Sequence, residues 1–227
     1  MHFSNIIQEA INLNNQKNKI AFYIIRRIRG PKNRDDPNQA VTAVAKTFVF
    51  SGSKLSGQII EAVQRGHLLL AVLGIRPLFE MMVNTSYTFN YPLKHKKDAI
   101  RHARKVCEEI IRKTNDTICF EREVEHSKID GKTIRGRARK VKMLKLYEIN
   151  YKGLSDWSHL MMRSPYISKP KEGEKFGINL ASQTLCLIHD VFEPICKYFN
   201  IVLDRRWEEG IIQFRNKYEI DFLGGDK

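Results

Sequence analysis

The stretch that decides the fold is His67–Asn90, HLLLAVLGIRPLFEMMVNTSYTFN. A segment of this length that is apolar on nearly every helical face is typical of the central, buried helix of a domain. Pro77 lies inside it and removes one backbone donor, which predicts a kink there. Its longest uninterrupted apolar run, Leu68–Ile75, is too short to cross a bilayer. The sequence therefore predicts a core helix and no membrane partner.

The segments on either side also carry apolar residues at helical spacing, and none shows the period-two alternation of a strand. They span residues 3–29, 37–65, 93–110, 178–199 and 204–218. Gly66 predicts a helix end, and Asp36-Pro37 and Asp204 predict helix starts. We expect an all-α fold, a single-domain helical bundle of long antiparallel helices over residues 1–227. Ser164–Gly177, which contains prolines and glycines, is predicted to be a flexible loop.

The second predicted helix contains the small residues Ser51-Gly52-Ser53 and Ser56-Gly57. Either the helix breaks there, or the small side chains allow a neighbouring helix to approach closely. The sequence leaves both interpretations open.

The charge balance points to a polyanionic partner. The chain has 39 Lys and Arg against 25 Asp and Glu, a net charge of +14 and a pI near 9.7. Nucleic acid is the expected partner, with RNA favoured over DNA. The alternative is a basic surface that serves solubility or binds an acidic protein.

The most basic stretch contains no acid before Glu148. Apolar residues recur through it at helical spacing, so we predict one ordered basic helix that follows a phosphate backbone. Its predicted nucleic-acid-binding residues are Lys132, Arg135, Arg137, Arg139, Lys140, Lys142 and Lys145.

Cofactor chemistry has no support in the sequence. It contains no glycine-rich phosphate loop, no nucleophile-elbow motif and no zinc-type cysteine pair, so neither a metal nor a cofactor is predicted. His95 and His102 are interpreted as lying on a solvated, lysine-rich helix face. The cysteines are predicted to be reduced thiols of a cytoplasmic protein, since no secretory signal precedes them.

One small set of polar residues predicts an active site. Arg76 and Glu80 stand one turn apart on the central helix, and His159 follows Ser155 by one turn. A histidine can exchange protons near neutral pH, and an arginine can neutralise a phosphoryl oxygen. Catalytic roles for Arg76, Glu80, Ser155 and His159 would suffice for a metal-independent ribonuclease. The alternative is structural: an Arg76–Glu80 salt bridge, Ser155 as a helix N-cap and His159 as a core histidine.

These motifs resemble those of a family of uncharacterised bacterial helical proteins. The resemblance rests on Gly66-His67, on Arg76–Glu80 (RPLFE), and on Tyr151 with Leu154–His159 (LSDWSH). The family pattern is G-H…R-x-L-x-E followed by Y-x-x-L-S-x-x-x-H, and the match covers less than half of the chain. Pro77 stands where the family has a small polar residue.

The predicted bundle and its arginine–histidine pair also resemble the HEPN superfamily of helical ribonucleases and nucleic-acid binders. That resemblance implies an effector of a phage-defence or toxin–antitoxin system and, because HEPN bundles often dimerise, a homodimer. The HEPN signature places its arginine and histidine a few residues apart on one helix, whereas Arg76 and His159 are far apart in this chain.

Overall fold

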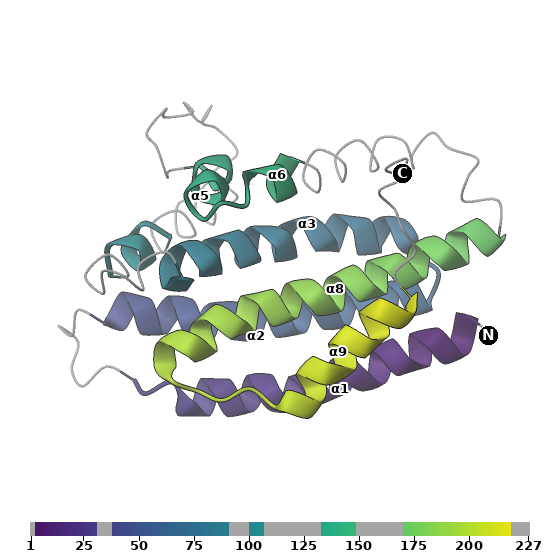
Figure 1. Ribbon diagram of the computed structural model, residues 1–227, viewed down its shortest axis with the longest axis horizontal. Helices are drawn as coiled ribbons and strands as arrows, with labels where there is room; N and C mark the ends of the chain where they lie inside the picture. The colour runs from purple at the N-terminus through teal and green to yellow at the C-terminus, as the bar shows by residue number, and fades with distance from the viewer. Residues whose placement is uncertain (1–2, 31–37, 91–99, 107–132, 149–169, 219–227) are drawn as a thin grey trace, which may run out of the picture.

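Helices are the only regular secondary structure in the residues that this computed structural model describes, 3–30, 38–90, 100–106, 133–148 and 170–218 (Figure 1). This confirms the predicted all-α helical bundle. Apolar side chains from all the long helices meet in one buried core, which explains why helical periodicity recurs along so much of the chain.

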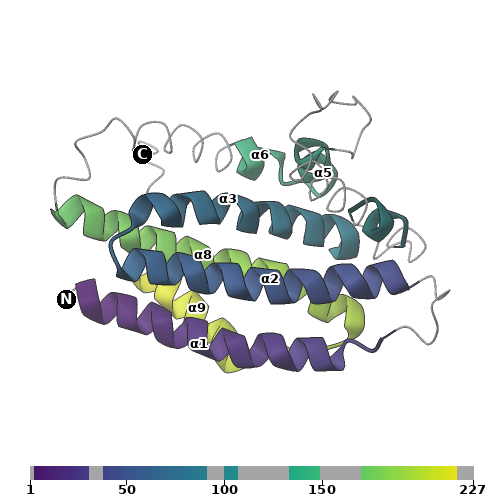
Figure 2. The ribbon, with the colours of Figure 1, turned by 180° about the vertical axis from the view of Figure 1, so that it is seen from behind.

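Four long helices with nearly aligned axes form the body of the bundle (Figures 1 and 2). They are α1 (Phe3–Arg27), α2 (Gln39–Gln64), α3 (Leu68–Thr85) and α8 (Pro170–Phe199), and a π-helical turn, η1 (Ser86–Asn90), prolongs α3. α9 (Arg205–Tyr218) packs across α1 and α8. Two short helices, α5 (Ile134–Lys140) and α6 (Leu144–Tyr147), lie over α3 in both views. Residues 100–106 are also helical.

The long helices are not all antiparallel. α2 runs against α1, since Lys17 contacts Ser53 while Gly57 faces Asn14. α3 and α8 run in the same direction, because Gly177 near the start of α8 faces Leu68 at the start of α3. At the other end, Phe89 of η1 packs edge-on against Tyr198 of α8, with ring centroids 5.3 Å apart.

The predicted end at Gly66 is confirmed, and its backbone explains it. Gly66 has φ +74°, in the left-handed region that favours glycine. Its N–H donates to the carbonyl of Val63 at 3.0 Å, and the N–H of His67 donates to that of Ala62 at 2.8 Å. This is the Schellman arrangement, which satisfies the last carbonyls of α2 and turns the chain directly into α3.

Close helix packing accounts for the small residues of α2, which is continuous through them. A Cβ on Gly52 would lie 3.0 Å from Ile188 Cδ1 of α8. On α3, a Cβ on Gly74 would lie 2.6 Å from Ile59 Cγ1 of α2, shorter than any ordinary contact. Of the two interpretations left open by the sequence, close approach is therefore the correct one.

The predicted loop Ser164–Gly177 is wrong over its second half, because α8 already begins at Pro170. Proline is well suited to a first helical turn, where its missing N–H has no partner in any case. Gly177 is needed for packing, since its Cβ would lie 3.2 Å from Val63 Cγ1. The part of the prediction that falls on 164–169 lies outside the described residues, as does the Asp36-Pro37 start.

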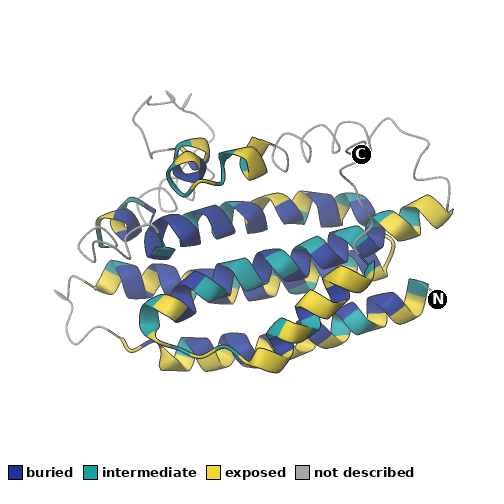
Figure 3. Cartoon of the chain, in the orientation of Figure 1, coloured by how far each residue is buried: buried dark blue, intermediate teal, exposed yellow. Residues whose placement is uncertain are grey.

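The central helix is less completely buried than predicted. Ile75, Leu78 and Met82 are fully buried, but Leu70 and Leu73 are 60% and 54% exposed. Figure 3 shows exposed and intermediate segments along α3 among the buried ones. The stretch Leu68–Asn90 is long and apolar enough to cross a membrane by length and composition, and half of it is buried here against other helices. Core helices share these properties, so composition alone does not separate the two roles.

The last helix matches its prediction. The N–H of Arg206 donates to Asp204 Oδ1 at 2.9 Å, so Asp204 caps α9. The predicted apolar stripe consists of Trp207, Ile211, Phe214 and Tyr218. The first three are buried, and Tyr218 is partly buried against the core. The Trp207 indole N–H donates to the Leu13 carbonyl at 3.1 Å, which ties α9 to α1.

Candidate nucleic-acid interface

The basic stretch forms two short helices where one continuous helix was predicted. The Thr133 hydroxyl accepts from the N–H of Gly136 at 3.1 Å and caps α5. α5 ends in a Schellman turn with Lys142 at φ 61°, where Lys142 N–H donates to Arg139 O and Met143 N–H to Ala138 O. The turn re-aims the chain, and α6 follows at Leu144. A lysine occupies the position that glycine usually takes, so this break could not be predicted from the residue types.

Arg137 faces inward, so its predicted role as a phosphate contact is wrong. Its side chain is 1% exposed. Its guanidinium donates to Asn84 Oδ1 at 2.6 Å and lies 5.7 Å from the ring centroid of Tyr87. With Ile134 and Ala138, which are also buried, it fixes α5 to α3 and η1.

The other cations of this stretch face solvent or its border. Arg135, Arg139, Lys142 and Lys145 are exposed, and Lys140 is half-buried. We call these five residues the α5–α6 basic surface. Arg135 pairs with Glu148 at 3.0 Å, both largely exposed, a kind of pair that contributes little to stability. No carboxylate of the described residues pairs with Arg139, Lys142 or Lys145.

Arg76 and Glu80 form the predicted pair on α3, with Arg76 Nε 3.6 Å from Glu80 Oε1. The two side chains are 49% and 22% exposed, so the pair lies at the helix surface and is not sealed in the core. One turn beyond Arg76, Phe79 packs against Tyr147 of α6 with ring centroids 6.4 Å apart. Arg76 and Glu80 thus lie close along α3 to the point where α6 contacts it.

The other predicted site residues, Ser155, His159 and Lys132, lie outside the described residues. Whether His159 approaches Arg76 therefore stays a prediction. No protein-family model, curated protein or solved structure matches the chain. The resemblances to the bacterial helical family and to HEPN proteins remain expectations from the motifs alone.

The lysine-rich surroundings of His102 predicted a solvated face, and this prediction is wrong. It is 2% exposed and stacks on Tyr87, with centroids 4.0 Å apart and an interplanar angle of 14°. Its Nδ1 lies 3.0 Å from the Tyr87 carbonyl oxygen. Tyr87 thus lies between His102 and Arg137, which explains how residues 100–106 and α5 share one contact on η1. His95 lies outside the described residues.

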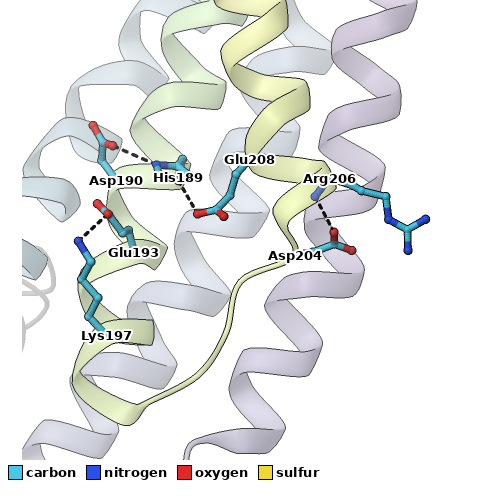
Figure 4. Close-up of polar contacts among 7 residues, drawn as sticks. All are labelled: His189, Asp190, Glu193, Lys197, Asp204, Arg206 and Glu208. Atoms are coloured by element: carbon cyan, nitrogen blue, oxygen red, sulfur yellow. Dashed lines mark hydrogen bonds and ion pairs between the residues drawn. The ribbon is translucent and has the colours of Figure 1, made fainter.

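A polar cluster that was not predicted from the sequence joins α8 to α9 (Figure 4). His189 Nδ1 lies 3.3 Å from Asp190 Oδ1, and its Nε2 lies 3.3 Å from Glu208 Oε1. The Asp190 hydrogen bond raises the pKa of His189, burial opposes it, and Glu208 adds to the rise. Glu193 is held by Lys197 at 2.7 Å.

Donor atoms of His189, Asp190 and Glu193 lie within 4.8 Å of one another, a geometry that could hold a metal ion. Each of these groups already has a protein partner in the cluster, so an ion pair network explains them without a metal. The H-D-x-x-E spacing was a readable signal, but Glu208 joins the cluster only through the packing of α9 on α8.

A buried lysine is the second feature that the sequence did not reveal. Lys17 on α1 is fully buried, and its ammonium donates to Asn14 Oδ1 at 2.9 Å, to Ser56 Oγ at 2.8 Å and to the Ser53 carbonyl. All three acceptors are neutral. Burial lowers the pKa of Lys17 to about 7. The small residues of α2 therefore have a second role, as acceptors for this ammonium.

Proposed function

We propose that this protein binds nucleic acid, RNA in the first place, through the α5–α6 basic surface. The observation that carries the proposal is the exposure of Arg139, Lys142 and Lys145, with which no carboxylate in the described part of the chain is paired. Such side chains are open to phosphate oxygens, and binding to them releases the counterions of the nucleic acid.

The order of the surface supports the proposal. The Thr133 cap, the Schellman turn and the buried Arg137 fix the backbone that carries the cations. Less conformational freedom is then lost on binding than with a disordered basic tail. No base-reading motif is recognisable in the sequence, so we expect binding driven by the backbone phosphates.

The proposal extends to catalysis if the protein also cleaves the RNA that it binds. Arg76 has half of its side chain exposed and lies one turn from the contact between α3 and α6. A guanidinium in that position is accessible to a phosphoryl oxygen and could stabilise the charge that develops there. His159 would serve as acid or base in a metal-independent reaction, and a role in defence against phage would fit such an effector.

The competing function is that of a non-catalytic interaction protein in which Arg76, Glu80 and His159 are structural. The Arg76–Glu80 pair alone is compatible with it, because i,i+4 pairs on helix surfaces are common and contribute little. A cytoplasmic location and a homodimer stay predictions under either function.

Binding is tested by fluorescence anisotropy with labelled RNA and DNA, using wild type and Arg139→Gln/Lys142→Gln/Lys145→Gln. We expect the triple variant to bind RNA at least tenfold more weakly and to keep its melting temperature. The matched control, Lys54→Gln/Lys171→Gln/Lys175→Gln, removes the same charge from exposed lysines on α2 and α8. Equal losses in both variants would contradict a localised surface, and no binding by wild type would reject the proposal.

Cleavage is tested by incubating the same RNA with wild type, Arg76→Gln and His159→Ala, each with and without EDTA. The ribonuclease form predicts cleavage by wild type that persists in EDTA and is lost in both variants. Cleavage that His159→Ala leaves unchanged would remove His159 from catalysis. Binding without any cleavage would favour the non-catalytic function.

A further inference from the structure

The outer face of α1 carries two exposed aromatic rings near its C-terminal end. Phe22 and Tyr23 are 57% and 42% exposed. The opposite face of the same turns is fully used by the core, where Ala21, Ile24 and Ile28 are buried. We call the exposed residues the α1 aromatic stripe, which consists of Lys19, Phe22, Tyr23, Arg26, Arg27 and Arg29.

Each ring in the stripe is matched with a guanidinium one turn away. The Cζ atom of Arg26 lies 4.2 Å from the Phe22 ring centroid, and that of Arg27 lies 5.2 Å from the Tyr23 centroid. These cation–π contacts hold both rings beside positive charge while leaving much of each ring accessible. Each ring and its guanidinium together form a flat, positively charged surface. Such a surface favours a partner that is both planar and anionic.

The stripe is also free of acidic residues. The sequence has no Asp or Glu between Glu9 and Asp35. No described carboxylate pairs with Lys19, Arg26, Arg27 or Arg29. Along α1 itself the charge of the stripe is therefore positive only, which favours a partner that brings phosphates.

We infer that the α1 aromatic stripe binds single-stranded nucleic acid, with unpaired bases stacked on Phe22 and Tyr23 and phosphates held by the flanking arginines. This rests on the proposed function and adds a second contact surface to it, because α1 and the α5–α6 basic surface lie on opposite sides of the bundle (Figure 1). Base stacking on exposed aromatic rings is tolerant of sequence and requires base faces that are open. In a duplex these faces are occupied by neighbouring base pairs, so a duplex offers the stripe only its phosphates.

The structure favours this ligand over an anionic membrane. A helix that lies in a membrane interface inserts its apolar face. In α1 that face is buried against α2, α8 and α9, and the exposed face presents two rings among charged side chains. The charge is complementary to both partners, but the apolar area available for insertion is small.

The test compares affinities for three probes: a labelled single-stranded RNA, its duplex with the complementary strand, and heparin as a polyanion without bases. Phe22→Leu/Tyr23→Leu keeps apolar side chains but removes both rings. We expect it to weaken binding of the single strand about tenfold or more and to leave duplex and heparin binding unchanged. The matched control, Phe22→Tyr/Tyr23→Phe, keeps both rings and should bind like wild type. Circular dichroism melting confirms that both variants are folded.

Three outcomes would overturn the inference. The first is single-strand binding that the leucine variant leaves unchanged, and the second is an equal loss of affinity for all three probes; either would show that stacking is not involved. In both cases the proposed function stands so long as wild type binds RNA. The third outcome is binding of wild type to phosphatidylserine vesicles and to none of the three probes, which would reject the proposed function as well.

Discussion

Among the described residues, Lys17 is one whose pKa burial lowers strongly. Its ammonium is removed from water and compensated only by neutral oxygens from Asn14, Ser53 and Ser56. An unpaired buried charge is costly, and the group responds with a pKa of about 7 against 10.5 in its ordinary setting. The free energy of unfolding therefore depends on pH between about 7 and 10.5.

The sign of that dependence follows from proton binding. Between about pH 7 and pH 10.5 the unfolded chain binds a proton at Lys17 and the folded chain does not. The contribution of Lys17 to the free energy of unfolding therefore rises with pH across this window, by on the order of a few kcal/mol. We expect Lys17→Met to lose this rise. Urea unfolding at pH 6.5, 8 and 9.5, followed by circular dichroism, measures the difference between variant and wild type.

Lys19→Met is the control for this experiment, because Lys19 is exposed on the same helix. It should leave the pH dependence of wild type unchanged. If the stability curves of Lys17→Met and wild type run parallel from pH 6.5 to pH 9.5, the ammonium is not destabilised in the folded state.

At the scale of elements, the contact between α2 and α3 depends on Gly74. Alanine normally stabilises a helix interior by about 1 kcal/mol relative to glycine. Here the added Cβ would lie 2.6 Å from Ile59 Cγ1, on a buried side chain that has little room to move. Overpacking of this kind costs about 1–3 kcal/mol. We predict that Gly74→Ala lowers the free energy of unfolding by about 1–2 kcal/mol in urea titrations.

Gly57→Ala on α2 provides the comparison, because its Cβ would face α1 and not the contact between α2 and α3. Its Cβ would meet only Asn14 Nδ2 at 3.7 Å, an ordinary contact. The variant should be as stable as wild type or more stable by up to about 1 kcal/mol. Similar effects of the two substitutions would show that helix propensity, and not the close approach of α3 to α2, controls these positions.

At the scale of the whole molecule, the net charge of +14 predicts that the proposed binding to nucleic acid depends on salt. For a single strand, the logarithm of the binding constant falls against the logarithm of salt concentration with a slope of about −0.7 for each phosphate neutralised. Removing Arg139, Lys142 and Lys145 should therefore make this slope shallower by about 2. Measuring the affinity at salt concentrations from about 50 to 300 mM gives this slope.

A control variant separates the effect of local contacts from that of the overall charge. It replaces three lysines on α2 and α8 by glutamine: Lys54, Lys171 and Lys175. It changes the net charge equally and should keep the slope of wild type. A change of slope that is the same in both variants would indicate that long-range attraction, and not contact with α5–α6, sets the salt dependence.

The sequence by itself determined most of the long helices and the core, because both depend on periodicity that is local to each segment. The stripe of α9, its Asp204 cap and the end of α2 at Gly66 were all readable in this way. The exposure of the basic segment could be predicted from the sequence only in part. Arg137 has the same charge as its neighbours, but its side chain faces Asn84 and Tyr87.

The tertiary structure alone decided which polar groups meet. Lys17 finds two of its acceptors on a different helix, His189 finds Glu208 across the α8–α9 contact, and Gly177 allows α8 to approach Val63 closely. Each depends on residues that are distant along the chain, and helical spacing carries no information about them. The physical reason is that periodicity records which side of a helix is buried, whereas the partner on that side is chosen by packing.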